Sequence, residues 1–185
     1  MTGNDATRRF YDALWPHAAL VLRVATILTG NATEADDLAQ ETLLKAFRSI
    51  DRFAIGTDAK AWLLAILRNT RIDRLRANAA SAANVSLDLL AGDPAAEPVV
   101  AEDEWNEPQE ILQSFEDAEV ISALQSLPEE IRWTLLLVDV EGLDHAEAAG
   151  ILDVPLGTIK SRSHRGRAML RAALLPLARE RRLVE

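Results

Sequence analysis

The most chemically distinctive part of this sequence is a cationic run at residues 155–167. Five side chains that can carry positive charge fall within a few helical turns: Lys160, Arg162, His164, Arg165 and Arg167. A turn followed by a helix with such charge is typical of the second half of a helix-turn-helix, whose last helix enters the major groove of DNA. The alternative interpretation is a solvated basic helix end, which the helix dipole favours.

Helical periodicity divides the side chains of this run between two faces. Ile159 is expected to face the preceding helix, and four polar side chains fall on the opposite face: Lys160, Ser161, His164 and Arg165. Lysine and arginine suit the O6 and N7 atoms of guanine, and serine can donate or accept a hydrogen bond. Three more residues are placed to contact phosphates: Thr158, Arg162 and Arg167.

The residues before the run predict the first helix of the unit. Gly142 can end one helix, and Asp144 can cap the N-terminus of the next. The apolar side of that next helix is made of small or branched residues: Ala148, Ala149, Ile151 and Leu152. The turn at residues 153–155 then leads into the recognition helix.

Charge is distributed unevenly along the 185 residues, whose net charge is −9. Residues 77–119 carry 11 acidic side chains and no basic one, whereas residues 156–185 carry 8 basic and 2 acidic side chains. A cationic face is therefore predicted in a protein that is acidic overall. Because this overall charge opposes approach to DNA, we expect the free chain to bind DNA weakly.

Composition also limits the kind of protein this is. The chain has no cysteine, which excludes disulfides, Cys-ligated zinc and thiol redox sensing. Its three histidines do not have the spacing of metal ligands, so no metal site and no cofactor is predicted. It has neither a run of 18 apolar residues nor a basic, apolar leader, so we expect a cytoplasmic protein without membrane insertion.

Residues 1–76 are predicted to form a first helical lobe. An apolar pattern ends at Gly30-Asn31 and is interrupted by Pro16, which predicts a kink or break near Trp15. A second helix should begin with a capping box at Thr33 and Asp36, and a third should span residues 58–76. Trp15, Trp62 and Trp133 are expected to be core residues.

The remaining sequence predicts a linker and a second lobe. Residues 77–107 have the composition of a flexible acidic linker. Residues 108–185 should form the second lobe, with a helical stripe from Pro108 onwards and Pro128 in the first turn of a helix at residues 129–139. The predicted fold is all-α, with two small helical domains joined by a flexible acidic linker and a helix-turn-helix in the second.

Several stretches, in this order and spacing, resemble the extracytoplasmic-function (ECF) sigma factors of bacterial RNA polymerase. ATEADDLAQETLLKAF at residues 32–47 resembles the polymerase-binding helix of that family, and AWLLAILRNTRIDRLR at residues 61–76 resembles its helix for the minus-ten promoter element. LPEE at 127–130, VEGL at 140–143 and PLGTIKSRSHRGR at 155–167 resemble its minus-thirty-five domain. Ser163 departs from the family, which usually has an apolar residue there, and this predicts looser packing of the recognition helix.

The resemblance implies a role for each surface. One set of side chains would dock on the coiled-coil clamp helices of core RNA polymerase: Asp37, Gln40, Glu41 and Leu44. Another would hold the separated strand at the minus-ten element: Lys60, Arg68, Asn69, Arg71 and Arg74. The loop at residues 51–57 would receive an extruded base, with Phe53 stacking on it. Paired carboxylates can also be catalytic, but no nucleophile or metal motif accompanies these.

The resemblance thus implies a non-enzymatic subunit that directs core polymerase to promoter DNA and helps to open it. An anti-sigma factor is expected as a further partner, since GTDAKAWL at residues 56–63 and HRGR at 164–167 look closest to the actinobacterial oxidative-stress branch, whose members are held by zinc-containing anti-sigma factors. The linker would be either a nucleic-acid mimic near the RNA exit path or a solvated spacer. Two rival functions are a sigma-mimicking adaptor that sequesters an anti-sigma factor and a conventional helix-turn-helix repressor.

Overall fold

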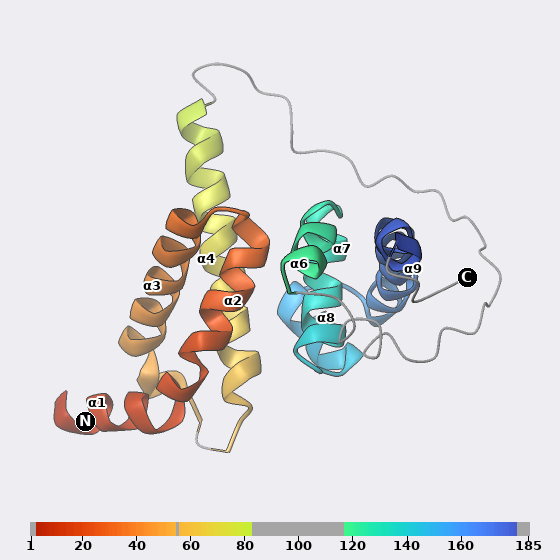
Figure 1. The fold of residues 1–185 in the computed structure, drawn as a ribbon. Coiled ribbons are helices and arrows are strands. Elements are labelled where there is room, and N and C mark those ends of the chain that lie inside the picture. Colours follow the sequence, from red (N-terminus) through yellow and green to blue (C-terminus); the bar gives the residue numbers. More distant parts are fainter. Residues whose placement is uncertain (1–2, 55, 83–116, 181–185) are drawn as a thin grey trace.

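The computed structural model describes residues 3–54, 56–82 and 117–180, and every regular element in these ranges is a helix. Figure 1 shows two groups of helices side by side, with α1 to α4 in one and α6 to α9 in the other. We call residues 3–82 the first lobe and residues 117–180 the second lobe. The prediction of an all-helical, two-lobed fold is confirmed.

The first lobe begins with a helix that proline divides. Helix α1 spans Gly3–Ala13, a short 3-10 helix, η1, spans Trp15–His17, and α2 spans Ala18–Thr29. The predicted break at Pro16 is confirmed, because a proline ring lacks the N–H that a continuous helix needs. Gly30 ends α2 in the left-handed conformation, with φ of 68°.

The other two long helices of the first lobe start at polar caps. Helix α3 spans Ala32–Arg48, and the Asn31 side chain accepts a hydrogen bond from the Glu34 N–H at 3.1 Å. The cap therefore lies before the predicted capping box at Thr33 and Asp36. After the 3-10 helix η2 (Ile50–Arg52), α4 spans Ala59–Ala82, so the helix continues past residue 76 into the predicted linker.

The second lobe contains four α-helices in its described part: α6 (Asp117–Gln125), α7 (Glu129–Leu135), α8 (His145–Leu152) and α9 (Leu156–Glu180). The predicted cap of α8 is confirmed, because Asp144 and Glu147 form a capping box. The rest of the predicted linker and the helical stripe expected at residues 108–116 lie outside the described residues.

A π-helix follows α7 without interruption. This segment, η3 (Leu136–Val140), lies where the sequence predicted the end of an ordinary helix. The Glu141 N–H donates to the Leu136 carbonyl at 2.9 Å, and Gly142 then adopts a φ of 71°. A π-turn inserts one residue into the helical pattern and so redirects the side chains that follow it.

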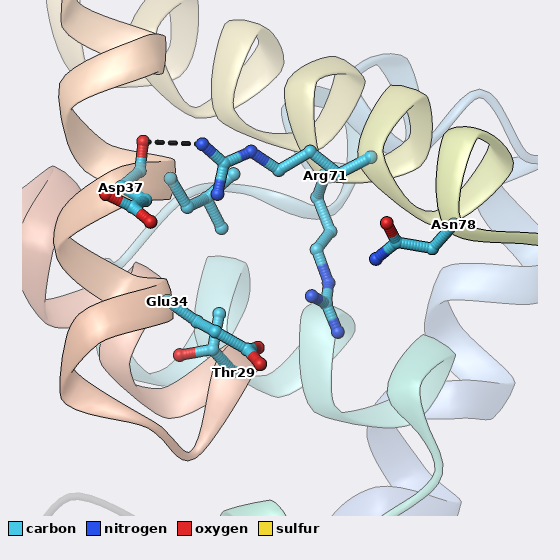
Figure 2. Close-up of a pocket in the computed structure, with 7 residues that line it drawn as sticks. Thr29, Glu34, Asp37, Arg71 and Asn78 are labelled. Atoms are coloured by element: carbon cyan, nitrogen blue, oxygen red, sulfur yellow. Dashed lines mark hydrogen bonds between the residues drawn. The ribbon is translucent and has the colours of Figure 1, made fainter. Parts of the chain in front are cut away.

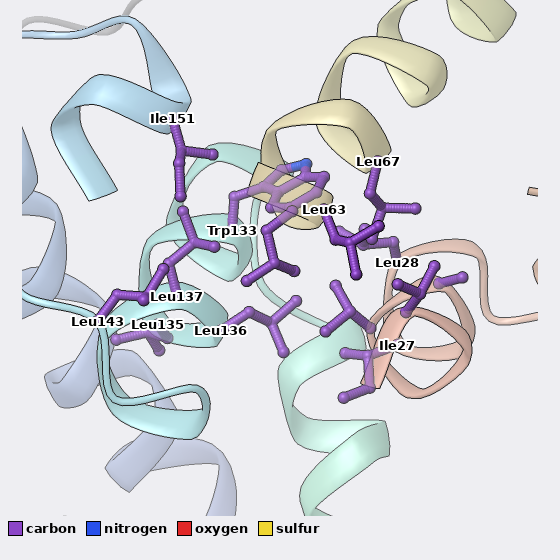
Figure 3. Packing of buried hydrophobic residues seen from close by; sticks show 14 of the residues in the cluster. Ile27, Leu28, Leu63, Leu67, Trp133, Leu135, Leu136, Leu137, Leu143 and Ile151 are labelled. Atoms are coloured by element: carbon purple, nitrogen blue, oxygen red, sulfur yellow. The ribbon is translucent and has the colours of Figure 1, made fainter. Parts of the chain in front are cut away.

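One apolar cluster joins the two lobes. Figure 3 shows Leu28 and Leu63 of the first lobe close to Trp133 and Leu136 of the second. Trp133 is 5% exposed, as expected of a core residue, and Trp62 packs partly buried against the core. The hydrophobic effect therefore favours a closed arrangement of the lobes, in addition to stabilising each lobe.

The prediction that Trp15 is a core residue is wrong. Its side chain is 50% exposed, because the break at Pro16 places it in the short η1 helix at the surface. Its ring lies 5.5 Å from that of Tyr11 and 6.3 Å from that of Phe10. No helix in the described part of the chain combines the length and the apolar character that crossing a membrane requires.

Candidate nucleic-acid interfaces

Helices α8 and α9 form the helix-turn-helix that the sequence predicts. The capping box starts α8, and Asp153 ends it in the left-handed conformation with φ of 53°. Asparagine and aspartate tolerate this conformation better than other residues with a side chain. The turn then places Pro155 immediately before α9, where its lack of an N–H costs no helical hydrogen bond.

The exposed face of α9 carries the side chains predicted to read bases. The four predicted base-reading residues are all exposed: Lys160, Ser161, His164 and Arg165. Ile159, on the opposite side, is completely buried. The Ser161 hydroxyl donates to the Thr158 carbonyl at 3.0 Å, while no ion pair within the described residues involves Lys160 or Arg165. The face thus offers cations and polar groups to a major groove.

The buried face of α9 is pressed against α7. A Cβ at Gly166 would lie 2.7 Å from Cγ2 of Ile131 and 3.0 Å from Cγ of Leu135, so glycine is required for this close approach. Ser163 is 2% exposed, and its hydroxyl has no hydrogen-bond partner in the described structure. A buried hydroxyl without a partner is unfavourable, while the looser packing of the recognition helix stays a prediction.

The predicted phosphate contacts of α9 are less available than its base-reading face. Thr158 and Arg162 are half-buried. Arg167 binds the Asp139 carboxylate, with Nη2 and Nε donating to Oδ1 at 2.7 and 3.0 Å. Because Asp139 lies in η3, this ion pair ties the recognition helix to the π-turn and engages the charge that was predicted to meet a phosphate.

In the first lobe, the predicted minus-ten cations contact the second lobe. Lys60 Nζ donates to the Glu141 carbonyl at 2.6 Å, and Arg68 Nη2 donates to the Leu152 carbonyl at 2.7 Å. Arg71 Nε lies 3.4 Å from Oε1 of Glu129. The resemblance implied that these side chains hold the separated DNA strand, but the closed arrangement of the lobes engages all three.

Arg74 joins two surfaces that were predicted to act separately. Its Nε lies 2.7 Å from Oε2 of Glu41, a predicted polymerase contact, and its Nη2 donates to the Asp37 carbonyl at 2.7 Å. Figure 2 marks the second of these bonds, at the edge of an open hollow of about 290 Å³ that Arg71 and Asn78 also line. Arg74 is therefore held by α3 in this conformation.

A small charge network surrounds Glu41. Lys45 Nζ lies 3.1 Å from both the Glu41 and the Asp73 carboxylates. Burial by itself would raise the pKa of Glu41, but the hydrogen bonds from Arg74 and Lys45 outweigh it and lower the pKa. Burial likewise opposes the charge on Lys45, and its bonds to Asp73 and Glu41 prevail and raise its pKa. Both shifts favour the charged forms.

The remaining predicted residues of the first lobe fall into two groups. Asn69 is exposed on α4, and Asp37, Gln40 and Leu44 are exposed on α3. Phe53 is only 3% exposed, and its ring lies 5.2 Å from that of Trp62. This burial does not agree with the prediction that Phe53 stacks on an extruded base, since the ring is a core group here.

Sequence reasoning missed the polar groups that hold the lobes together. Arg23 Nη2 lies 2.6 Å from Oε1 of Glu141. Arg132 Nη1 donates to the Leu28 carbonyl of the first lobe at 3.2 Å. Helical periodicity does not reveal such pairs, because their members lie more than 100 residues apart in the sequence.

Comparison with known families agrees with this architecture. Residues 16–81 match the model of Sigma-70 region 2, and residues 117–170 match that of Sigma-70 region 4. In the part of the chain that the structure describes, no group of three or more potential ligand side chains could hold a metal ion. The two matched regions correspond to the two lobes.

Several relatives and solved structures are similar over most of the chain. The ECF RNA polymerase sigma factor SigE of Mycolicibacterium smegmatis is 39% identical over 92% of this chain, which spans 63% of that relative. EcfG of Rhodopseudomonas palustris is 39% identical over 81% of this chain and 76% of its own length. The sigma factor RpoE of Bartonella quintana, solved in complex with the anti-sigma factor NepR, has a TM-score of 0.69 and 27% identity over 89% of this chain and 96% of that one.

The fold also resembles that of CnrH, solved in complex with the cytosolic domain of CnrY. That structure has a TM-score of 0.59 and 23% identity, covering 93% of this chain and 94% of the other. The family to which the two matched models belong, that of the sigma factors, is not a family of enzymes. On the order of its two matched regions, its helix-turn-helix and its identity with curated relatives, this chain belongs to the ECF RNA polymerase sigma factors.

Proposed function

We propose that this chain binds core RNA polymerase, directs it to promoters through two DNA elements and assists promoter opening. The observation that carries the proposal is the recognition face of α9, on which Lys160, Ser161, His164 and Arg165 are exposed together. These side chains have the donors and acceptors that major-groove readout requires. The minus-thirty-five element is their proposed target, with Thr158, Arg162 and Arg167 nearer the DNA backbone.

The minus-ten element is the proposed target of α4. Lys60, Arg68, Asn69, Arg71 and Arg74 would follow the backbone of the separated strand, where cations supply most of the affinity. Four of these five have protein partners in the closed arrangement. Binding of the strand therefore requires that the lobes separate and that Arg74 leave Glu41. Phe53 is not part of this proposal.

The exposed side of α3 is the proposed polymerase surface. Three of its side chains are exposed: Asp37, Gln40 and Leu44. Glu41 beside them is partly exposed and is paired with Lys45 and Arg74. An apolar contact surrounded by carboxylates fits a basic helical partner. The proposed domain that binds polymerase and the minus-ten element is residues 1–76. The proposed linker is residues 77–107, and the proposed minus-thirty-five domain is residues 108–185.

An anti-sigma factor is a further proposed partner, and the proposed location is the cytoplasm. The similar sigma factor of B. quintana was solved with such a factor, which supports a protein regulator for this chain too. Membership of the oxidative-stress branch stays a prediction, since relatives of equal identity are named SigE in one organism and EcfG in another.

Run-off transcription tests the proposal. Core RNA polymerase freed of its own sigma subunits is incubated with a pool of bacterial promoter fragments, with and without this chain, and the 5′ ends of the transcripts are mapped. We expect new, discrete start sites only when the chain is present. A chain that gives no transcripts but captures an anti-sigma factor would be an adaptor, and one that binds a palindromic operator without polymerase would be a repressor.

Charge reversal tests the polymerase surface. Changing Asp37 and Glu41 together to lysine should abolish binding to core polymerase, because both carboxylates would then repel a basic partner. Asp12→Lys and Asp51→Lys, on exposed residues elsewhere in the first lobe, make a matched control. Circular dichroism establishes that both variants fold. Retained polymerase binding by the Asp37/Glu41 variant would place the docking surface elsewhere.

A further inference from the structure

The point at which the lobes meet contains a buried carboxylate, that of Glu141. Its side chain is only 2% exposed, yet it lies beside two cations of the first lobe. Arg23 Nη2 is 2.6 Å from Oε1, and Lys60 Nζ is 3.8 Å from Oε2. Lys60 also donates to the backbone carbonyl of Glu141 at 2.6 Å. A carboxylate buried to this extent is stable only with such partners.

The π-helix explains how Glu141 reaches the first lobe. The Glu141 N–H bonds to the carbonyl of Leu136, five residues earlier, so the inserted residue changes the direction of the chain at this point. Asp139, two residues before, turns to the other side and binds Arg167 of α9. A single short segment therefore contacts both the first lobe and the recognition helix.

The cations at this site remain accessible to solvent although the carboxylate is not. The side chain of Arg23 is 54% exposed and that of Lys60 is 33% exposed. A guanidinium group binds carboxylate and phosphate oxygens with the same planar geometry, and a lysine binds either as a point charge. Once the lobes separate, the two cations would be left beside each other with no anion between them.

We propose that Arg23 and Lys60 form one anion site, which holds the Glu141 carboxylate in the closed chain and a backbone phosphate of single-stranded promoter DNA in the open chain. The inference rests on the proposed function and adds to it Arg23 of α2, a residue outside the predicted minus-ten set. Glu141 is then an intramolecular competitor of DNA. The neighbouring contacts of Arg68 and Arg71 release at the same time, since the second lobe supplies their partners too.

Replacing Glu141 tests the competition directly. Glu141→Gln removes the charge but keeps the size of the side chain and the carbonyl that Lys60 binds. Its control, Glu130→Gln, removes an equal charge from an exposed position on α7. The probe is a fluorescent single-stranded oligodeoxynucleotide of mixed sequence, followed by anisotropy with the full chain. We expect E141Q to bind about tenfold more tightly, as befits loss of a tethered competitor. Equal affinity of E141Q and E130Q would overturn the proposal.

Arg23 is tested in the E141Q background, where no carboxylate masks it. Arg23→Ala should lower the slope of log affinity against log salt by about 0.7, the value for one phosphate contact to a single strand. Arg48→Ala in the same background is the control, because Arg48 is an exposed cation of the same lobe. An unchanged slope for R23A, or an equal change for R48A, would show that Arg23 makes no specific phosphate contact.

The absence of cysteine allows the opening itself to be measured. Thr33→Cys and Ala172→Cys introduce one exposed label site in each lobe, and energy transfer between the dyes reports their separation. E141Q should lower the transfer efficiency. R23A in the otherwise wild-type chain should lower it too, because it breaks the same ion pair by removing the exposed partner. Unchanged efficiency in both variants would show that the ion pair of Arg23 and Glu141 does not hold the lobes together.

Transcription separates this inference from the proposed function. If the wild-type chain fails to start transcripts with core polymerase, the function assigned above is wrong, while the anisotropy and energy-transfer results still decide whether Arg23 and Lys60 form an anion site. If transcription succeeds but E141Q behaves like E130Q in both assays, only the anion site is wrong.

Discussion

The two cationic regions of this molecule differ in what they contact. On α9, Lys160, His164 and Arg165 are exposed on the face opposite the core. On α4, Lys60, Arg68 and Arg71 contact carbonyl and carboxylate groups of the second lobe. Both regions have the charge that DNA binding requires, but the α9 side chains are exposed, whereas those of α4 are partly buried against the second lobe. Accessibility and not composition therefore separates a surface that is ready to bind from one that must first be uncovered.

The difference also gives a second physical reason to expect weak DNA binding by the free chain. Each phosphate that the protein leaves uncontacted keeps its counterions on the DNA. The free energy that their release would add to binding is then lost. With α4 occupied by the second lobe, the closed chain can use little more than the recognition helix. Core polymerase, by binding the lobes apart, would make both regions available together.

The largest effect is expected at the recognition helix. Lys160→Ala or Arg165→Ala should each cost about 1 to 3 kcal/mol of discrimination at particular minus-thirty-five bases. Arg179→Ala, on an exposed cation near the end of the same helix, is the control. Transcription by the polymerase complex on promoter variants measures the effect. Uniform weakening across all variants would instead make these side chains phosphate contacts.

The free chain offers a sharper form of the same comparison. Binding of duplex DNA by the closed chain should lose salt dependence in R162A, a proposed phosphate contact of α9, by about 0.9 in slope for the one lost contact, and should not in R68A. Filter binding over a salt series measures both. A similar loss in R68A would mean that α4 is accessible without opening of the lobes.

The packing that keeps the recognition face outward should also be sensitive. Gly166→Ala places a Cβ against Ile131 and Leu135, and overpacking of this kind costs about 1 to 3 kcal/mol of the free energy of unfolding. Gly150→Ala is the matched control, because nothing lies within 4 Å of its Cβ position, and it should stabilise α8 by about 0.5 to 1 kcal/mol. Urea unfolding compares the two, and equal stabilities would contradict the close contact of α9 with α7.

A smaller gain is expected at Ser163 on the same buried face. Ser163→Ala removes a hydroxyl that has no partner in the described structure, and it should raise the free energy of unfolding by about 1 kcal/mol. Ser161→Ala, on the exposed face, should leave stability nearly unchanged. Destabilisation by S163A would show that the hydroxyl is satisfied by a group absent from the described contacts, such as water.

The smallest effect concerns the charge network around Glu41 in the first lobe. The folded protein lowers the pKa of Glu41 below its usual value of 4.5. The network therefore stabilises the fold at pH values above 4.5, and this contribution is lost as the pH falls through the folded-state pKa. Glu41→Gln should flatten the acid side of the stability profile by about 0.5 kcal/mol or less, since solvent screens the pair. Thermal unfolding between neutral and acidic pH measures this, with Glu34→Gln as an exposed control.

Local rules predicted much of the fold. The break at Pro16, the end of a helix at Gly30 and the N-cap at Asp144 were correct, because each depends on residues that are close in sequence. The orientation of α9 was also correct, since Ile159 is completely buried and Lys160 is exposed. Local rules failed at the start of α3, where Asn31 and Thr33 are both good capping residues and Asn31 is the cap. They also failed at Leu136–Val140, where the α-helix changes to a π-helix and no residue type indicates the change.

The sequence by itself determined the helical class, the two lobes, the cationic recognition face and the membership of a sigma factor family, because these follow from periodicity, caps and recognisable motifs. Only the tertiary structure decided which cations are available. Lys60, Arg68, Arg71 and Arg74 look alike in the sequence, yet each has a partner from a distant segment. The second lobe, packed against the first around Leu63 and Trp133, supplies the partners of the first three, and α3 supplies those of Arg74. Charge is a property of the residue, but its accessibility depends on how the whole chain packs.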